Sequence, residues 1–267
     1  MSLSFGRWVI ALVILLPFAI GRTWRNRAVL QASWRRVLLL GAVGVAAFNS
    51  LAYADLHFTS ATNAVLTNSF IPILILPLGA IFLRESFNRR QAAGVAISFV
   101  GVMTIFTHGQ LNRLLALDIN QGDVLLLLAA LDWAVYTLLL RRLDPKIDRL
   151  GLLLILIVVG LVCIAPFFWW ELAQGRVAAL TPSNVATFLY AGIFPSVLAY
   201  LFYNYGVAQV GPARAGNFIH LMPVFGTLLA IVFLGERFEW FHLAGINGIF
   251  AGLLLGSINP PRQHIST

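Results

Sequence analysis

Long apolar stretches separated by short polar segments fill this chain almost from end to end. Nine stretches stand out, at 8–21, 37–56, 63–83, 92–107, 122–140, 150–170, 185–207, 213–234 and 240–257. A helix needs roughly 20 residues to cross a hydrocarbon core about 30 Å thick, and most of these stretches approach that length. The longest connection, 108–121, leaves no room for a globular domain. The pattern predicts an all-α fold, a polytopic bundle of membrane helices.

The composition agrees with a chain whose solvent is the lipid bilayer. Hydrophobic residues make up 60% of the sequence, charged residues only 10%, and the mean hydropathy is +0.87. Soluble domains carry about a quarter charged residues. The net charge of +8 comes from residues at the ends of apolar stretches and not from basic runs, so no nucleic-acid partner is predicted. Cys163 stands alone, which excludes a disulfide framework.

Basic residues are distributed unequally between alternate loops. One set of loops holds fourteen of them, in segments 22–36, 84–90 and 141–149 and at Arg214 and Arg262. The other set holds four, at Arg7, Arg113, Arg176 and Arg237. The positive-inside rule places the richer set in the cytoplasm. We therefore predict a multi-pass protein of the plasma (inner) membrane with a cytoplasmic C-terminus and an N-terminus outside.

The chain also contains an internal repeat. A shift of 151 residues places 64–101 over 215–252 without a gap, and eleven of 38 positions are identical, including the pair Pro72 and Pro223. Such self-similarity at a fixed period indicates a duplicated unit. The second copy holds five of the apolar stretches and the first copy four. An odd number of spans per copy would insert the copies in opposite orientation, which is the inverted-repeat plan of secondary transporters.

The repeat predicts the organisation of the chain. The expected parts are a first repeat without its first helix at 1–107, an extracytoplasmic linker at 108–121, a second repeat at 122–258 and a cytoplasmic tail at 259–267. We expect that the chain lacks the first helix of a ten-helix protein, which would also explain the outside N-terminus. A native nine-span protein is the alternative.

Several motifs resemble a known family. The second copy carries Gly211-Pro212-Ala213 before a span, Pro223 in mid-span, Leu234-Gly235-Glu236-Arg237 at its end and a last helix with regularly spaced glycines. This pattern resembles the second EamA repeat of the drug/metabolite transporter superfamily, and 60–106 is similar to the other half. The resemblance covers nearly the whole chain. It implies ten helices, alternating access, and export or uptake of a small polar metabolite, without indicating which one.

Asp132 is the sharpest candidate for a site residue. It lies midway through 122–140, where a charged group costs about 2.5–3.5 kcal/mol on insertion scales unless it is paired or hydrated. Tyr136 shares its helix face and Trp133 is adjacent. The functional hypothesis is a binding site for a substrate amine, or a proton carrier. A carboxylate held by neighbouring hydroxyls or water for packing is the alternative.

Asn217 and His220 form a second candidate pair, one helical turn apart within 213–234. Two polar groups on one face favour the lining of a cavity. The alternative is a histidine that bonds between helices, a contact worth about 0.6 kcal/mol in membrane proteins. No second histidine or carboxylate lies at ligand spacing, so no metal is predicted.

The repeat suggests a third group of candidates. Asn49 and Tyr53 fall on Tyr200 and Asn204 under the 151-residue shift, so the same two residue types exchange places. A central cavity on a pseudo-two-fold axis would produce this exchange. The group is extended to Tyr203 and Asn68. Hydrogen bonds between helices without any ligand are the alternative for each of them.

A stripe of small residues recurs every fourth position in the last stretch, at Ala244, Gly248, Gly252 and Gly256. Such stripes allow close contact between membrane helices. A homodimer face at 244–256 is the alternative.

These features favour a secondary transporter for a small metabolite such as an amino acid. No Walker motif is present to bind ATP, and no cofactor is predicted. Proton coupling through Asp132 or His220 is a further hypothesis. An enzyme would need clustered His, Asp or Ser residues near a membrane surface, and the sequence offers none. A channel-like or non-transporting membrane scaffold is the remaining alternative.

Overall fold

A computed structural model describes residues 2–55, 61–84, 88–110, 112, 121–175 and 181–257, with backbone only for 52–55, 61–63 and 121. Every regular element in these ranges is helical. The α-helices are α1 (Ser2–Arg25), α2 (Arg27–Ala32), α3 (Trp34–Leu40), α4 (Phe48–Asp55), α5 (Ala61–Asn68), α6 (Ile71–Leu83), α7 (Arg89–Phe106), α9 (Gln121–Arg141), α10 (Arg149–Ala173), α11 (Pro182–Ala191), α12 (Ala199–Val210), α13 (Pro212–Asn217), α14 (Leu221–Leu234) and α15 (Trp240–Ser257). Two π-helical segments, η1 (Gly41–Ala47) and η2 (Gly192–Leu198), and one 3₁₀ turn, η3 (Phe218–His220), complete them.

Seven of the described helical stretches are long and apolar enough to cross a membrane, which confirms the polytopic all-α bundle. They are Ser2–Arg25, Ala64–Leu83, Gly122–Arg141, Arg149–Ala173, Pro182–Val210, Pro212–Leu234 and Trp240–Ser257. Two of the nine expected spans, 37–56 and 92–107, are not among the seven. Both are helical where the structure describes them, so nine spans remain a prediction. The predicted linker 108–121 lies mostly, and the tail 259–267 entirely, outside the described residues.

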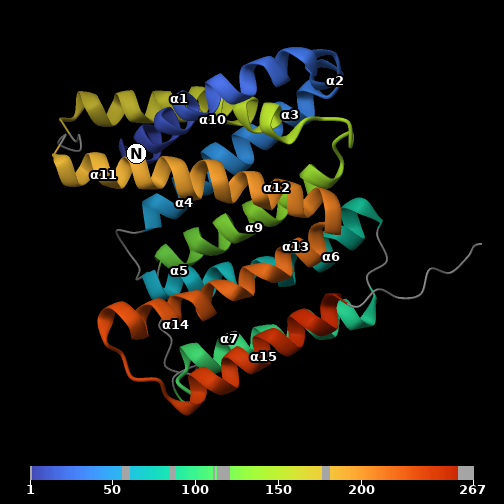
Figure 1. The fold of residues 1–267 in the computed structure, drawn as a ribbon, viewed down its shortest axis with the longest axis vertical. Helices are drawn as coiled ribbons and strands as arrows, with labels where there is room; N and C mark the ends of the chain where they lie inside the picture. Colours follow the sequence, from blue (N-terminus) through green and yellow to red (C-terminus); the bar gives the residue numbers. More distant parts are fainter. Residues whose placement is uncertain are drawn as a thin grey trace, which may run out of the picture.

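The helices lie side by side in one bundle (Figure 1). Along its longest dimension, α1 and α10 pack together at one edge, and α7 and α15 pack together at the other. Between these edges, α9 contacts α4, α5, α6 and α12. The middle of the bundle is therefore built around α9, the helix that carries Asp132, Trp133 and Tyr136.

Several structural features recur at the spacing of the sequence repeat. The segments η1 and η2 begin and end 151 residues apart, and so do α7 and α15. Arg84 and Gly235, which follow α6 and α14 in left-handed conformation with φ of 52° and 70°, show the same spacing. The backbone thus follows the register that the sequence repeat predicts. The number of spans in each repeat stays a prediction.

Glycines bring α7 and α15 into close contact. Gly94 lies against Gly252, and Gly101 lies against Gly245, so the two helices run antiparallel. A Cβ atom placed on Gly94 would come within 2.6 Å of the Gly252 carbonyl oxygen, and one on Gly101 within 2.6 Å of the Gly245 oxygen. Only residues without a side chain allow the two backbones to approach this closely.

This contact explains the small-residue stripe within the chain. Gly248, Gly252 and Gly256 all lie near α7 of the same chain, whereas Ala244 is exposed. The stripe serves a helix contact within the chain. Because α7 already lies against Gly252 and Gly256, a homodimer face at 244–256 could use only the rest of this stretch, and it stays a prediction.

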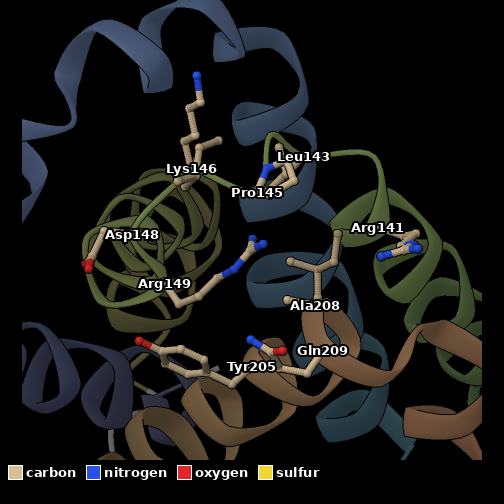
Figure 2. Close-up of a pocket in the computed structure, with 11 residues that line it drawn as sticks. Arg141, Leu143, Pro145, Lys146, Asp148, Arg149, Tyr205, Ala208 and Gln209 are labelled. Carbon is tan, nitrogen blue, oxygen red and sulfur yellow. The ribbon is translucent and has the colours of Figure 1, made fainter.

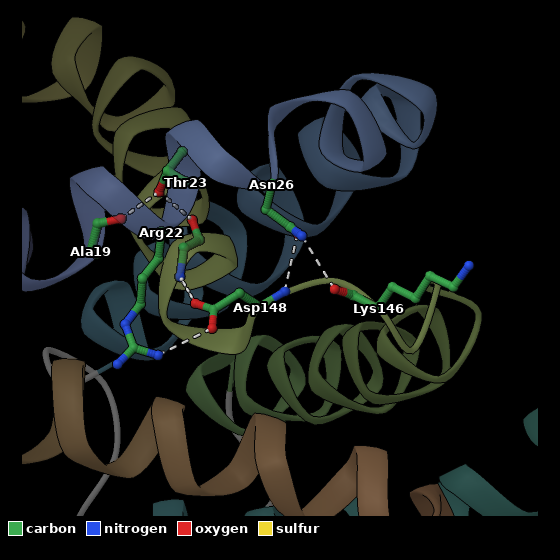
Figure 3. Close-up of polar contacts among 7 residues, drawn as sticks. Ala19, Arg22, Thr23, Asn26, Lys146 and Asp148 are labelled. Atoms are coloured by element: carbon green, nitrogen blue, oxygen red, sulfur yellow. Dashed lines mark hydrogen bonds and ion pairs between the residues drawn. The ribbon is translucent and has the colours of Figure 1, made fainter.

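Two of the most basic segments of the sequence meet at one end of the bundle (Figure 3). Arg22 at the end of α1 pairs with the Asp148 carboxylate at 3.3 Å. Asn26 accepts from the Asp148 N–H at 3.1 Å and donates to the Lys146 carbonyl at 3.3 Å. The connections after α1 and before α10 therefore lie on one side, as the charge distribution predicts. We refer to this side as the basic end.

Candidate functional site

The two π-helical segments interrupt the regular hydrogen bonding of the helices that contain them. Such π turns occur frequently at functional sites. In η2 the cause is visible in the sequence, since Pro195 has no N–H to give to the carbonyl of Ala191. Ser196 Oγ donates to that carbonyl instead, at 2.7 Å. The Ser196 hydroxyl thus replaces the missing backbone N–H as the donor to this carbonyl, in the middle of the span.

Tyr200 and Asn49 likewise donate hydrogen bonds from their side chains to backbone carbonyls of η1. The Tyr200 hydroxyl donates to the Gly44 carbonyl at 2.6 Å, and Asn49 Nδ2 donates to the Val45 carbonyl at 2.8 Å and to the Tyr200 hydroxyl oxygen at 3.2 Å. Asn49 and Tyr200 are buried and stand 151 residues apart. Two residues at equivalent positions of a two-fold repeat can touch only near its axis, so this contact lies where the predicted repeat would place that axis.

Aromatic rings surround the same place. Trp133 lies 5.1 Å from Tyr136, 5.2 Å from Tyr200 and 5.1 Å from Tyr203, measured between ring centroids. Trp8 meets Tyr200 edge to face at 5.1 Å. These separations are favourable for aromatic pairs, and Tyr and Trp also offer a polar atom. Together with the neighbouring polar residues the rings form what we call the central cluster, composed of Trp8, Asn49, Trp133, Tyr136, Thr137, Tyr200, Tyr203 and Asn204.

The central cluster contains buried hydrogen-bond donors that no described residue satisfies. Tyr136 donates its hydroxyl hydrogen to Asn204 Oδ1 at 2.8 Å, and the hydroxyls of Thr137 and Tyr203 share a hydrogen bond at 2.7 Å. Asn204 Nδ2 and Trp8 Nε1, in contrast, are buried and have no partner among the described residues. Buried polar groups normally find partners because desolvation without one is costly. The cluster therefore contains two N–H groups that have no partner among the described residues.

Arg7 also belongs to this site, although the sequence did not predict it. In the sequence Arg7 counts only as one of the four basic residues of the loops expected outside the cytoplasm. Its side chain is buried, and Nη2 donates to Asn49 Oδ1 at 2.8 Å. The guanidinium also lies 4.9 Å from the ring of Trp8. Helical spacing is the signal that could have found it, since Arg7 shares the buried face of α1 with Ser4 and Ala11.

Asn217 and His220 lie in a different polar group. His220 Nδ1 is 2.6 Å from Ser98 Oγ, and Nε2 is 2.9 Å from the carbonyl oxygen of Ser69. Ser98 Oγ also reaches Asn217 Oδ1 at 3.0 Å. A carbonyl only accepts, so Nε2 carries the hydrogen. These contacts join α7, α13, η3 and the break between α5 and α6, and they lead away from the central cluster.

The remaining candidates are more dispersed. Asp132 is half-buried in α9, and its Oδ2 atom is buried without a hydrogen-bond partner among the described residues. Asn68 is half-buried at the end of α5. Tyr53 lies in α4, but its side chain is outside the described part of the structure. The structure thus brings together six of the predicted residues, which are Asn49, Trp133, Tyr136, Tyr200, Tyr203 and Asn204.

The chemistry of the central cluster is that of binding. Aromatic faces, amides and hydroxyls can enclose a small polar molecule and donate to its oxygen atoms. Within the described ranges no three His, Cys, Asp or Glu side chains gather where they could hold a metal ion. Together with the membrane-spanning bundle, these groups are those expected of one class of protein, a membrane transporter.

Comparison with known proteins gives the family within this class. Residues 1–107 and 120–258 match the EamA-like transporter family. The match covers most of the chain, which therefore belongs to this family, as the sequence motifs implied. The expectations of a membrane transporter and of a multi-pass membrane protein are confirmed at this level.

The relatives extend across bacteria and archaea. The uncharacterized transporter YyaM of Bacillus subtilis is 25% identical over 253 residues, which cover 95% of this chain and 82% of the relative. An uncharacterized transporter of Archaeoglobus fulgidus is 28% identical over 257 residues, covering 95% and 86%. A probable amino-acid metabolite efflux pump of Salmonella typhimurium is 26% identical over 187 residues, covering 67% and 62%. A crystal structure with 17% identity and a TM-score of 0.77, covering 96% of this chain and 86% of that one, shares the fold.

Proposed function

We propose that this chain is a secondary transporter that carries a small polar metabolite, such as an amino acid, through the central cluster. The observation that carries the proposal is the pair of unsatisfied buried donors, Asn204 Nδ2 and Trp8 Nε1, within a wall of aromatic rings. A solute carboxylate or carbonyl would accept from these donors and remove their desolvation cost. Membership of a transporter family and the name of the Salmonella relative support this choice of solute.

We further propose that transport proceeds by alternating access. Helices that are interrupted in the middle of a span are typical of transporters with inverted repeats. Here α5 and α6 are separated at Ser69–Phe70, and α13 and α14 are separated by η3. In this proposal the two interruptions are the flexible points of the cycle, and the basic end with the C-terminus faces the cytoplasm across a plasma membrane.

Counterflow in liposomes tests the transport proposal. The chain is reconstituted, the vesicles are loaded with unlabelled amino acids, and entry of each radiolabelled amino acid is followed. We expect saturable exchange of at least one of them, and protein-free liposomes are the control. Flux that rises linearly with concentration would indicate the channel-like alternative. Absence of exchange for amino acids and other small polar metabolites would contradict the proposal.

Proton coupling is proposed at Asp132, since Oδ2 is a buried acceptor without a partner among the described residues. Asp132→Asn keeps the shape of the side chain but cannot lose or gain the proton. We expect the variant to retain counterflow and to lose accumulation driven by an imposed pH gradient. Asp144→Asn, at an exposed carboxylate between α9 and α10, is the matched control. Gradient-driven accumulation that survives in Asp132→Asn would exclude this residue as the proton carrier.

A further inference from the structure

A pocket of about 450 Å³ opens at the basic end of the bundle. The connection between α9 and α10 forms one wall, and the last turns of α12 form the other. Arg149 extends into the space, with Tyr205 and Gln209 facing it across the pocket (Figure 2). The exposed residues Arg141 and Lys146 belong to the rim. None of the residues that line this pocket belongs to the central cluster.

Arg149 is the unusual member of the pocket. The residue is only 8% exposed, and its guanidinium faces the pocket without a hydrogen bond or salt bridge to any residue that the structure describes. The neighbouring carboxylate of Asp148 is engaged elsewhere (Figure 3). One of its oxygens accepts from the N–H of Gly151 at 2.8 Å, and the other pairs with Arg22 at 3.3 Å.

An Arg149 side chain without a paired anion is energetically costly for the protein when no ligand is bound. Burial removes part of the hydration of this charge, which is costly when no described residue pairs with it through a hydrogen bond. Arg149 is also the first residue of α10, where the partial positive charge of the helix N-terminus disfavours a cation and favours an anion. Both effects would be relieved by a negatively charged group in the pocket.

We propose that this pocket binds a phosphoryl group. The planar guanidinium of Arg149 matches two phosphoryl oxygens at once, and such bidentate pairs are the strong charge-assisted hydrogen bonds. The Tyr205 hydroxyl and the Gln209 amide supply neutral donors on the opposite wall, and Arg141 and Lys146 add positive charge at the rim. The phosphoryl group belongs either to a free phosphate compound or to the headgroup of an anionic lipid, since the pocket lies at the ends of three spans. The residues that line this pocket are distinct from those of the central cluster.

Titration of the purified full chain with inorganic phosphate in a neutral detergent, followed by calorimetry, tests the site. We expect binding that Arg149→Gln weakens about tenfold or more, because charge-assisted hydrogen bonds are lost. The matched control is Arg142→Gln, an exposed arginine in the same connection that does not line the pocket. Tyr205→Phe keeps the ring and removes only the hydroxyl, so a smaller loss there tests the site even where Arg149→Gln folds poorly.

Native mass spectrometry distinguishes the two sources of the phosphoryl group. A lipid occupant predicts that phosphatidylglycerol, but not phosphatidylcholine, stays bound to the wild-type chain and to Arg142→Gln and is lost from Arg149→Gln. A free compound predicts phosphate binding that depends on Arg149 without retention of phosphatidylglycerol. The proposal is overturned if neither ligand binds, or if binding is the same in Arg149→Gln and Arg142→Gln.

Discussion

Asn204→Leu is expected to reduce solute exchange about tenfold or more and to destabilise the fold. Leucine has the same branched arrangement of heavy atoms but offers neither donor nor acceptor, so a bound solute loses the Nδ2 donor of the central cluster. The fully buried Tyr136 hydroxyl also loses its acceptor, now 2.8 Å away. A buried donor left unpaired costs about 1–3 kcal/mol. Counterflow in liposomes and thermal unfolding in detergent measure the two effects.

The double variant Tyr136→Phe/Asn204→Leu separates binding from stability. Replacing both hydrogen-bond partners by apolar groups is often nearly neutral, so we expect the unfolding midpoint to recover. Exchange should stay low, because the donor for the solute is still missing. Asn247→Leu, at an exposed position of α15, is the control for introducing leucine. Wild-type exchange in the double variant would show that the pair of Tyr136 and Asn204 serves the fold alone.

The sequence was sufficient for the fold class because membrane solvation leaves few choices. Apolar stretches near 20 residues must be helices when no water is present to satisfy the backbone. The 151-residue shift places Asn49 and Tyr200 at equivalent positions, and the structure shows that these two residues touch. Their contact at 3.2 Å agrees with that register. No spacing within a single helix would have indicated it.

Other features depend on neighbours that spacing does not reveal. Asn217 and His220 share a helix face, as predicted, but that face meets Ser98 of α7 and the Ser69 carbonyl. The way in which the helices cross determines which residues this face contacts, and the sequence pattern gives no information about that crossing. The π-helical segments were missed for a similar reason. Only η2 contains a proline, whereas η1 shows no comparable signal in its sequence.

Two hydrogen bonds join residues that are 151 positions apart, and they suggest how the halves are coupled in the proposed cycle. One links Asn49 to Tyr200 beside the π-helical segments, and the other links His220 to the Ser69 carbonyl at the helix interruptions. Both lie where the two halves meet. In the proposed cycle, a movement of one half against the other would therefore strain these two contacts.

Arg7→Leu is expected to affect stability and transport together. Arg7 fixes the Asn49 amide by donating to Oδ1 at 2.8 Å, which directs Nδ2 toward Tyr200 and the η1 backbone. Without this donor a buried acceptor is left behind, at a cost of about 1–3 kcal/mol, and the contact with the Trp8 ring is also lost. We expect the thermal unfolding midpoint to fall by roughly 2–10 °C and counterflow to fall with it.

Two further variants test whether the effect depends on the guanidinium group and on its location at residue 7. Arg7→Lys keeps the charge and one donor but not the planar guanidinium, so an intermediate loss is expected. Arg22→Gln removes the cation of an exposed ion pair with Asp148 at the basic end, where such pairs contribute about 0–1 kcal/mol, and should leave exchange unchanged. If Arg7→Leu behaves like Arg22→Gln in both measurements, Arg7 does not position Asn49 for transport.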